Sequence, residues 1–326
     1  MANIVLCRKC NLKCPYCFAN ELKSSNYEDI SGEALDTILD FVSVDGNVGL
    51  IGGEPLLHPD FDRIIEQIKN DERFSYVTVF TNGILADRYM SQLCSNKVKI
   101  LINVNSVSDI GKCNFGKIEK NIEILLNNGM RQNITLGINL YKKEQDFSDF
   151  LSLVKKFNFD RVRFSVSIPQ DRTINPIEYF NEMKATLLSF LKELRDLRVA
   201  PCPDCNVIPS CVYSKEERAF LKTLPYYSQL DTELLLGEKS VCSPIIDIYP
   251  DYLASRCFGC YDNLKIDIRK FKNINDLRNY FFMWIDSKRV HIPVRTSCTN
   301  CYKFNTFACY GSCLGFKHPR PKVQEK

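Results

Sequence analysis

The stretch Cys10-Asn-Leu-Lys-Cys14-Pro-Tyr-Cys17 places three cysteines within eight residues, directly after a short apolar run at about residues 3–6. We expect that run to be the first strand of the fold. Three thiolates at this spacing can hold three irons of a cubane iron–sulfur cluster and leave the fourth iron without a protein ligand. An open coordination position of this kind lets a metal site bind a further molecule.

Outward from this stretch, short apolar runs rich in β-branched residues alternate with longer amphipathic runs. The predicted strands lie at about residues 3–6, 47–51, 76–81, 98–104, 133–139 and 161–167. Helical patterns lie at about residues 32–43, 59–70, 84–94, 115–128, 145–157 and 176–196. Because such alternation gives parallel strands with right-handed crossovers, the sequence predicts an α/β fold, a partial (β/α)6 TIM-type barrel. Ligands of such barrels bind at the carboxyl ends of the strands.

The pattern changes at about residue 198, where four prolines between residues 201 and 225 interrupt helices and an irregular, cysteine-rich remainder follows. We therefore expect three regions. The barrel takes residues 1–197, a connector with Cys202, Cys205 and Cys211 takes 198–240, and a small irregular cysteine-rich C-terminal domain takes 241–326.

Composition narrows the class of protein. The N-terminus has no charged segment followed by an apolar run, and no apolar stretch approaches the roughly 18 residues that span a bilayer. We therefore expect a cytoplasmic protein without a membrane partner, in which 16 cysteines indicate metal binding rather than disulfides. With only 3 histidines, thiolate sites favour iron–sulfur clusters or structural zinc. A net charge of +4 does not indicate a nucleic-acid partner.

The Cys-x3-Cys-x2-Cys run has an aromatic residue, Tyr16, directly before its last cysteine. It thereby resembles the signature of the radical S-adenosylmethionine (SAM) superfamily. The resemblance implies a SAM-binding [4Fe–4S] cluster on Cys10, Cys14 and Cys17, with Tyr16 at the cofactor. The alternative is a zinc knuckle built on two Cys-x2-Cys pairs, since Cys7 precedes the run. Only three residues separate those pairs, however, against about 15–20 in zinc ribbons, and we expect Cys7 to be a strand residue.

The second predicted strand ends in Gly52-Gly53-Glu54-Pro55. Glycines let the backbone approach a ligand closely, and a neighbouring carboxylate can accept hydrogen bonds from an ammonium group. The resemblance implies that this segment binds the amino group of SAM. Taken alone, the segment is equally typical of an ordinary turn after a strand.

Polar side chains also follow the later strands, at the edge where the resemblance places the SAM pocket. The cofactor-binding candidates there are Thr81, Asn82, Asn103, Asn105, Ser106 and Asn139. Strand alternation further puts Arg163, Ser165 and Ser167 on one face of the sixth strand, which we expect to be the barrel interior. Capping and turn roles are an equal alternative for each residue taken singly.

The C-terminal cysteines resemble the SPASM extension of radical SAM enzymes, which carries auxiliary [4Fe–4S] clusters. The candidate ligands are Cys242, Cys257, Cys260, Cys298, Cys301, Cys309 and Cys313. Two features depart from the family pattern: an x7 spacing replaces x5 before Cys309, and no cysteine follows Cys313. We also expect a short hairpin between Cys242 and Cys257. The isolated Cys94 and Cys113 are expected to be ordinary buried residues.

By the family pattern, Cys242, Cys257 and Cys313 belong to one auxiliary cluster, and Cys298, Cys301 and Cys309 belong to another. Each set then needs a fourth ligand, for which Cys260 and the connector cysteines are candidates. One or two auxiliary clusters are therefore expected. A four-thiolate zinc site remains the alternative, because it uses the same ligands.

The resemblance implies that a reduced flavodoxin or ferredoxin delivers an electron, that SAM is cleaved to a 5′-deoxyadenosyl radical, and that this radical abstracts hydrogen from a substrate carbon. The leading hypothesis is maturation of a ribosomally made peptide or protein by crosslinking, epimerisation or oxidation. Because the chain begins at its first strand, we expect direct docking or a separate peptide-recognition protein. The alternatives are radical oxidation or rearrangement of a small, sugar-like molecule and a non-catalytic iron–sulfur or zinc scaffold. No general base is evident.

Overall fold

The computed structural model describes residues 1–17, 28–169, 174–204, 208–238, 242, 244–260 and 264–316. The connector cysteine Cys205 lies outside these residues. Ten strands form one sheet in the order β10-β9-β8-β1-β2-β3-β4-β5-β6-β7. Their bounds are β1 (Ala2–Val5), β2 (Asn47–Ile51), β3 (Tyr76–Thr81), β4 (Val98–Asn103), β5 (Ile134–Leu140), β6 (Arg161–Val166), β7 (Ala200–Pro203), β8 (Asp247–Ile248), β9 (Leu253–Ser255) and β10 (Ile266–Asp267).

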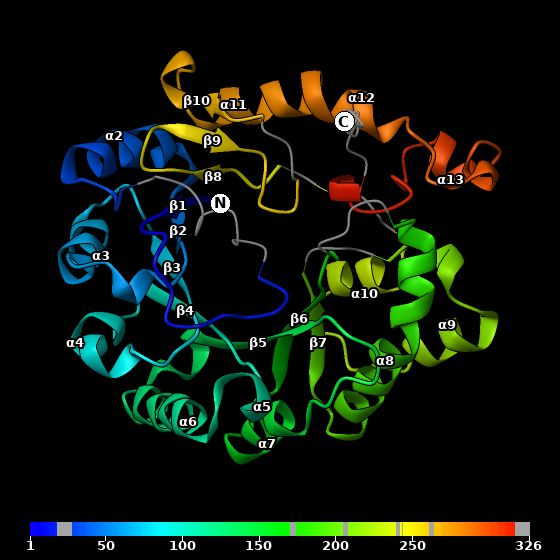
Figure 1. The fold of residues 1–326 in the computed structure, drawn as a ribbon, viewed down its shortest axis with the longest axis horizontal. Helices are drawn as coiled ribbons and strands as arrows, with labels where there is room; N and C mark the ends of the chain where they lie inside the picture. Colours follow the sequence, from blue (N-terminus) through cyan, green and yellow to red (C-terminus); the bar gives the residue numbers. More distant parts are fainter. Residues whose placement is uncertain are drawn as a thin grey trace, which may run out of the picture.

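The strands β1 to β7 are parallel and follow one another across the sheet. Helices cover the outside of this curved sheet, and the strands form its inner wall (Figure 1). The covering helices are α2 (Gly32–Val42), α3 (Phe61–Asn70), α4 (Met90–Leu93), α6 (Lys112–Asn127), α7 (Ser148–Lys156) and α8 (Pro176–Asp196). The predicted partial TIM-type barrel is confirmed, with the sheet left open.

A single large core lies between the sheet and its helices. Apolar side chains such as Ile4, Leu50 and Val79 point outward from the strands, and Ile38 and Ile65 meet them from the helices. Each of these five is fully buried. The β-branched runs thus form strands because one of their faces packs against an amphipathic helix. The opposite face of the strands faces the barrel interior.

The seventh strand, β7, lies inside the predicted connector and pairs with β6 from Ala200 opposite Arg161 to Pro203 opposite Phe164. It contains two prolines, Pro201 and Pro203, which lack the N–H that a central strand would have to donate. A strand of this composition is tolerated because β7 is the last strand at this edge. The sheet therefore continues past residue 197, and the division into three regions stays a prediction.

The C-terminal region begins on the other edge of the sheet. The strand β8 runs parallel to β1 and forms the predicted hairpin with β9. Asn3 donates from Nδ2 to Oδ1 of Asp247 at 2.7 Å, which fastens this hairpin to β1. The chain then passes through α11 (Ile274–Tyr280), α12 (Ser287–Val290) and α13 (Tyr302–Asn305) toward the far side of the barrel (Figure 1).

On that far side the C-terminal region contacts the start of α8. Asn175 donates to the carbonyl oxygen of Val294 at 2.9 Å. The ring of Phe316 packs against Tyr179 and Phe180, with centroids 6.1 and 5.9 Å apart. The C-terminal region thus links the β1 side of the barrel to the α8 side. Between them the connector supplies α9 (Lys215–Leu221) and α10 (Gln229–Leu235).

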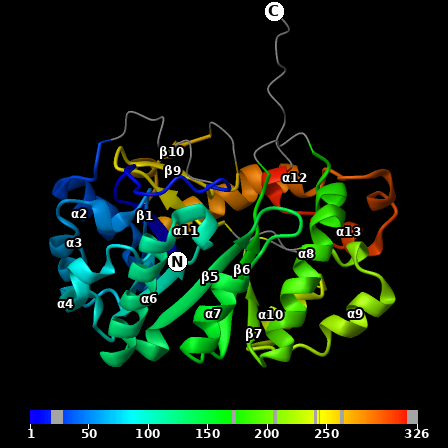
Figure 2. The ribbon, with the colours of Figure 1, turned by 60° about the horizontal axis from the view of Figure 1, so that its bottom comes forward.

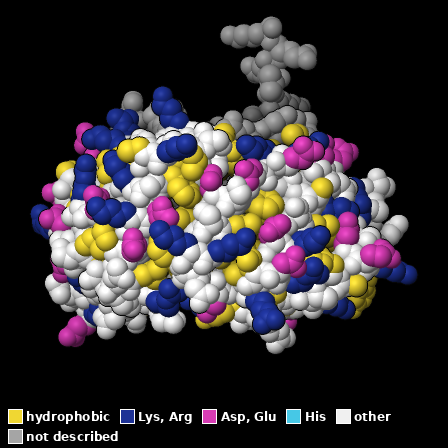
Figure 3. Space-filling model, turned by 90° about the horizontal axis from the view of Figure 1, so that it is seen from below, with side chains coloured by type: hydrophobic (Ala, Val, Ile, Leu, Met, Phe, Trp, Pro, Cys, Tyr) yellow, Lys and Arg dark blue, Asp and Glu magenta, His cyan; other side chains and the backbone are white. Residues whose placement is uncertain are grey.

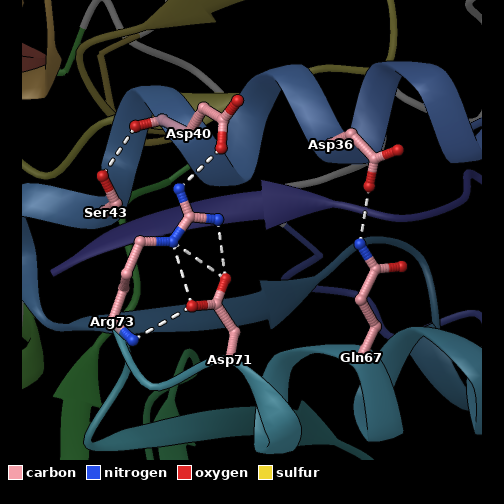
Figure 4. A network of polar contacts seen from close by, with 6 residues as sticks. All are labelled: Asp36, Asp40, Ser43, Gln67, Asp71 and Arg73. Carbon is pink, nitrogen blue, oxygen red and sulfur yellow. Dashed lines mark hydrogen bonds and ion pairs between the residues drawn. The ribbon is translucent and has the colours of Figure 1, made fainter.

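The outer surface is polar and mixed in charge. Arg73 bonds the carboxylates of Asp71 and Asp40, and Gln67 donates to Asp36 at 2.6 Å, so that α2 is tied to α3 and the loop after it (Figure 4). On the face drawn in Figure 3, basic and acidic side chains are interspersed. Among the described residues, we find no helix with both the length and the apolar character needed to cross a bilayer.

Candidate functional site

The loop that carries Cys10, Cys14 and Cys17 leaves β1 at the carboxyl edge of the sheet and lies along the upper rim of the molecule (Figure 2). Cys10 and Cys14 are half-buried against the main core, and Cys17 packs beside Val5 and Ile51. A turn brings the amide of Cys17 to the carbonyl oxygen of Cys14 at 3.1 Å. The three thiols thus share one short loop, and their role as cluster ligands stays a prediction.

Cys7 lies just past the end of β1 and is buried. Its thiol donates to the carbonyl oxygen of Glu54 at 3.2 Å. Burial raises the pKa of Cys7 to about 12, with the charges of Asp29 and Glu54 adding to the effect. Cys7 is thus a buried thiol that is hydrogen-bonded to the end of β2, and its expected place outside the ligand set stays a prediction.

The two glycines after β2 let the cysteine loop lie directly on the strand end. The amide of Gly53 donates to the carbonyl oxygen of Cys7 at 2.9 Å, and that of Glu54 to Lys9 at 2.8 Å. A Cβ on Gly53 would stand 2.3 Å from the carbonyl oxygen of Lys9. The glycines therefore allow a close approach between two segments of the chain, namely the cysteine loop and the end of β2.

The carboxylate of Glu54 is buried and accepts three hydrogen bonds from its own chain. Thr81 donates its hydroxyl at 2.6 Å, and the amides of Asn82 and Leu56 donate at 2.8 and 3.2 Å. Burial raises the pKa of Glu54 to about 7, although these hydrogen bonds oppose the rise. Glu54 therefore joins the ends of β2 and β3, and its predicted contact with SAM remains a prediction.

Asn82 extends this polar group to the cysteine loop, because its side-chain amide donates to Asn11 at 2.8 Å. Asn11 lies between the first two cysteines of the motif. The ends of β1, β2 and β3 are therefore joined by hydrogen bonds at one edge of the barrel.

Four of the predicted cofactor residues line one hollow at the carboxyl ends of β4 and β5: Tyr16, Asn105, Ser106 and Asn139. The hydroxyl of Tyr16 donates to Oδ1 of Asn105. Asn139 in turn accepts from the hydroxyl of Ser165 at 2.5 Å. The aromatic residue of the cysteine motif thus reaches across the barrel mouth to the strands on the other side.

The hollow also contains Asp109 and Tyr141, which sequence reasoning did not single out. Tyr141 lies 4.8 Å from Tyr16 between ring centroids and donates its hydroxyl to Asp109 at 3.0 Å. Its position directly after β5 is the signal that could have identified it, since residues at strand ends face the ligand edge. Asn103, by contrast, is not among the residues that line the hollow.

In the C-terminal region, four thiols lie together: those of Cys242, Cys257, Cys260 and Cys313. Cys260 donates a hydrogen bond to Cys257 and lowers the pKa of that thiol. Burial, together with the charges of Cys242 and Cys257, raises the pKa of Cys313 to about 12. The amide of Cys260 donates to the carbonyl oxygen of Cys257 at 3.1 Å, and a Cβ on Gly315 would stand 2.3 Å from the carbonyl oxygen of Gly259, so the segment that follows Cys313 lies against the turn of Cys257 and Cys260. Cys260 thus lies near the set that sequence spacing left one ligand short, and its role as a ligand stays a prediction.

Arg256 lies against this group and is itself fully buried. Its guanidinium points an N–H at the sulfur of Cys242 at 3.3 Å and at that of Cys257 at 3.8 Å. The other side of the guanidinium forms two hydrogen bonds with Asp286, at 2.7 and 2.8 Å. A buried cation beside four thiols stabilises their thiolate forms, which are the forms that bind metal.

Cys298, Cys301 and Cys309 lie together near α13. The amide of Cys301 donates to the carbonyl oxygen of Cys298 at 3.1 Å, and the amide of Cys309 donates to Lys303 at 3.0 Å. The thiol of Cys309 accepts from the amide of Gly311 at 3.2 Å. Cys298 and Cys309 are buried and Cys301 is half-buried.

The remaining cysteines lie apart from these groups. Cys202 is on β7, where burial raises its pKa to about 12 and its charged neighbours are Asp231, Arg161 and Asp160. Cys94 is half-buried. Cys113 is exposed, so its expected burial is wrong: it stands at the start of α6, outside the apolar stripe that packs on the sheet.

Within the described residues, no three histidine, cysteine, aspartate or glutamate side chains lie close enough to bind a single metal ion. A [4Fe–4S] cluster takes four thiolates on different irons, so its ligands stand further apart than those around one ion. Thiol-only groups of three and four cysteines are the donor sets that such clusters use. The cysteines of this chain therefore fit iron–sulfur clusters by donor chemistry.

Comparison with known proteins identifies the class of the N-terminal region. Residues 4–155 match the family model described as the radical SAM superfamily. This range contains the cysteine loop, Glu54 and the residues that line the hollow. This part of the chain is therefore similar to radical SAM domains, and the cofactors of that family are a [4Fe–4S] cluster and SAM.

Curated relatives match only a portion of the chain. The molybdenum cofactor biosynthesis protein moc-5 of Caenorhabditis elegans is 30% identical over 51% of this chain and 29% of its own length. The GTP 3′,8-cyclase of a Synechocystis species is 26% identical over 49% of this chain and 52% of its own length. The chain thus spans about a third to half of the length of these relatives.

Solved structures match nearly the whole fold. SuiB of Streptococcus suis, bound to the precursor peptide SuiA, covers 92% of this chain and 69% of its own, with a TM-score of 0.59 and 14% identity. The enzyme anSMEcpe with bound AdoMet covers 96% of this chain and 88% of its own, with a TM-score of 0.64 and 18% identity. At these identities the likeness extends to the fold, including its C-terminal region.

Proposed function

We propose that this chain is a radical SAM enzyme that modifies a peptide or protein substrate. One observation carries the proposal: the loop of Cys10, Cys14 and Cys17 lies at the same barrel edge as the hollow of Tyr16, Asn105 and Asn139. Metal ligands and polar side chains at the carboxyl ends of parallel strands are what SAM binding in such a barrel requires.

The roles of the residues follow from their positions. Cys10, Cys14 and Cys17 would hold the cluster, which supplies reductive cleavage of bound SAM to a carbon-centred radical. Asn105, Ser106 and Asn139 offer hydrogen-bonding groups to polar portions of SAM.

Glu54 acts on the same edge through Thr81 and Asn82, whose positions it fixes by hydrogen bonds. It is also the proposed acceptor for the amino group of SAM. The electron that the reaction needs comes in this proposal from a reduced flavodoxin or ferredoxin.

Two features support a peptide substrate. The solved structures that cover almost the whole chain include complexes with a peptide, the precursor SuiA in one and the Kp18Cys peptide in another. In addition, the C-terminal region of this chain brings together one group of four thiols and one of three, the donor sets of auxiliary clusters. In this proposal a peptide docks at the barrel mouth, with or without a separate recognition protein.

A nucleotide or sugar-like small molecule is the second candidate, because several curated relatives are GTP 3′,8-cyclases. Those matches cover half of this chain or less. In this proposal they include the barrel, in which the radical is formed, more than the region that selects the substrate. A shared barrel does not imply a shared substrate, because the substrate is chosen by residues added around it.

The test compares the two substrate classes directly. The reconstituted protein is incubated anaerobically with SAM, dithionite and either GTP or a library of short peptides that includes any encoded beside its gene, and products are analysed by mass spectrometry. The proposal predicts a peptide of altered mass and unchanged GTP. Consumption of GTP with unmodified peptides would overturn the peptide assignment in favour of the second candidate.

A further inference from the structure

The cysteine group near α13 lacks one member of a complete ligand set. Cys298, Cys301 and Cys309 supply three thiols, whereas a [4Fe–4S] cluster held only by protein takes four. Nothing after Cys313 is cysteine, and Cys313 itself belongs to the group around Arg256. The connector cysteines, which lie earlier in the chain, are candidates for the fourth thiol.

The connector is fixed against this group by hydrogen bonds. Lys303, between the second and third cysteines of the group, donates to Oγ of Ser210 at 3.2 Å and to the carbonyl oxygen of Gly237 at 3.4 Å. Gly237 has a φ of +62° and lies so close to Ser210 that a Cβ would stand 2.3 Å from the Ser210 amide nitrogen. The turn η5 (Ser210–Val212) is therefore held directly beside α13.

Cys211 is the central residue of that turn. Burial raises the pKa of Cys211, the charge of Arg295 lowers it, and the charges of Cys309 and Cys298 raise it again. The hydrogen bonds of Lys303 hold the turn that carries Cys211 beside the segment that carries Cys298, Cys301 and Cys309.

We propose that Cys211 is the fourth thiolate ligand of a [4Fe–4S] cluster held by Cys298, Cys301 and Cys309. A ligand from the connector then fills the coordination position that a cysteine after the Cys-x3-Cys pair takes in the SPASM pattern. The proposal rests on the proposed function only in expecting iron rather than zinc. With the group of Cys242, Cys257, Cys260 and Cys313, the C-terminal region then has a second complete set of four thiolates.

Cys202 provides a matched control in the same connector. It is half-buried, and burial raises its pKa as it does that of Cys211, but its charged neighbours are Asp231, Arg161 and Asp160 and not the thiols near α13. Replacement of Cys202 removes a connector thiol without touching the proposed ligand set.

The experiment counts iron in a background from which the SAM-binding cluster has been removed by Cys10→Ala, Cys14→Ala and Cys17→Ala. After anaerobic reconstitution this background should hold roughly eight irons per chain. Adding Cys211→Ala should lower the content to roughly four, whereas adding Cys202→Ala should leave it unchanged. Cys211→Ser should retain iron with an altered electron paramagnetic resonance (EPR) spectrum of the reduced cluster, because an oxygen replaces a sulfur ligand.

Several results would overturn the proposal. Unchanged iron content and an unchanged spectrum in both Cys211 variants would show that Cys211 does not bind the cluster. Loss of iron with Cys205→Ala in place of Cys211→Ala would move the ligand to the other connector cysteine. One zinc per chain at this site would contradict the cluster.

If Cys211→Ala does not fold, the EPR spectrum of Cys211→Ser alone tests whether Cys211 is a ligand. Failure of the proposed function is seen separately, as absence of SAM cleavage by protein that retains all its iron.

Discussion

At the scale of single residues, Glu54 does more than its motif indicated. Its carboxylate ties β2 to β3, and its pKa is raised to about 7 from an ordinary value near 4.5. Between these two values the folded protein keeps a proton that the unfolded chain releases. The stability from this proton is therefore fully present below about pH 4.5 and is lost as the pH rises through 7.

The prediction is that Glu54→Gln removes this pH dependence. A shift from 4.5 to about 7 corresponds to about 3 kcal/mol in the free energy of unfolding. Denaturant unfolding of the reconstituted protein between pH 5.5 and 8 measures the effect, with Glu33→Gln on the exposed face of α2 as the control. Parallel pH profiles for the wild type and Glu54→Gln would contradict this account.

The motif residues were found from sequence because strand ends meet at one edge of a parallel barrel. Tyr16, Asn105 and Asn139 do lie together there. The internal partners of Glu54 were not predictable, because a spacing pattern shows which carboxylate is present and not which donors fold toward it. The pairing of Asn3 with Asp247 was equally hidden, since 244 residues separate them along the chain.

At the scale of elements, apolar periodicity located most of the barrel. The bounds of β2, β3 and α8 agree with those predicted, since each has a strong apolar pattern and a clear end. The seventh strand was missed because its prolines are typical of loops, and only its edge position makes them acceptable in a sheet. The predicted helix at 84–94 is shorter, with α4 limited to Met90–Leu93 after a 3-10 turn.

The hairpin β8–β9 depends on Asp247, which is buried and accepts hydrogen bonds from Asn3 and from the amide of Phe258, both at 2.7 Å. Asp247→Ala leaves two part-buried donors without a partner, which should cost about 2 kcal/mol of stability. Arg73→Ala, which breaks the exposed network of Figure 4, should cost less than about 1 kcal/mol. Urea unfolding compares them, and equal losses would contradict the assigned role of Asp247.

At the scale of the whole molecule, the C-terminal region is built from short elements, and its order depends on thiols brought together from distant segments. Metal binding to such a region contributes directly to its folding. Removal of iron should therefore lower hydrogen-exchange protection across residues 290–316 and leave β2 to β5 protected. Hydrogen-exchange mass spectrometry of reconstituted and iron-free protein measures this. Equal protection in both forms would show that the C-terminal region folds without its metal.

The central claim is that this barrel cleaves SAM at a cluster held by Cys10, Cys14 and Cys17. The most direct measurement is 5′-deoxyadenosine formed from SAM by anaerobically reconstituted protein in the presence of dithionite. The account predicts 5′-deoxyadenosine from the wild type and from Cys202→Ala, and none from Cys14→Ala, in which one of the three ligands is missing. Undiminished product from Cys14→Ala, or none from iron-loaded wild type, would contradict it.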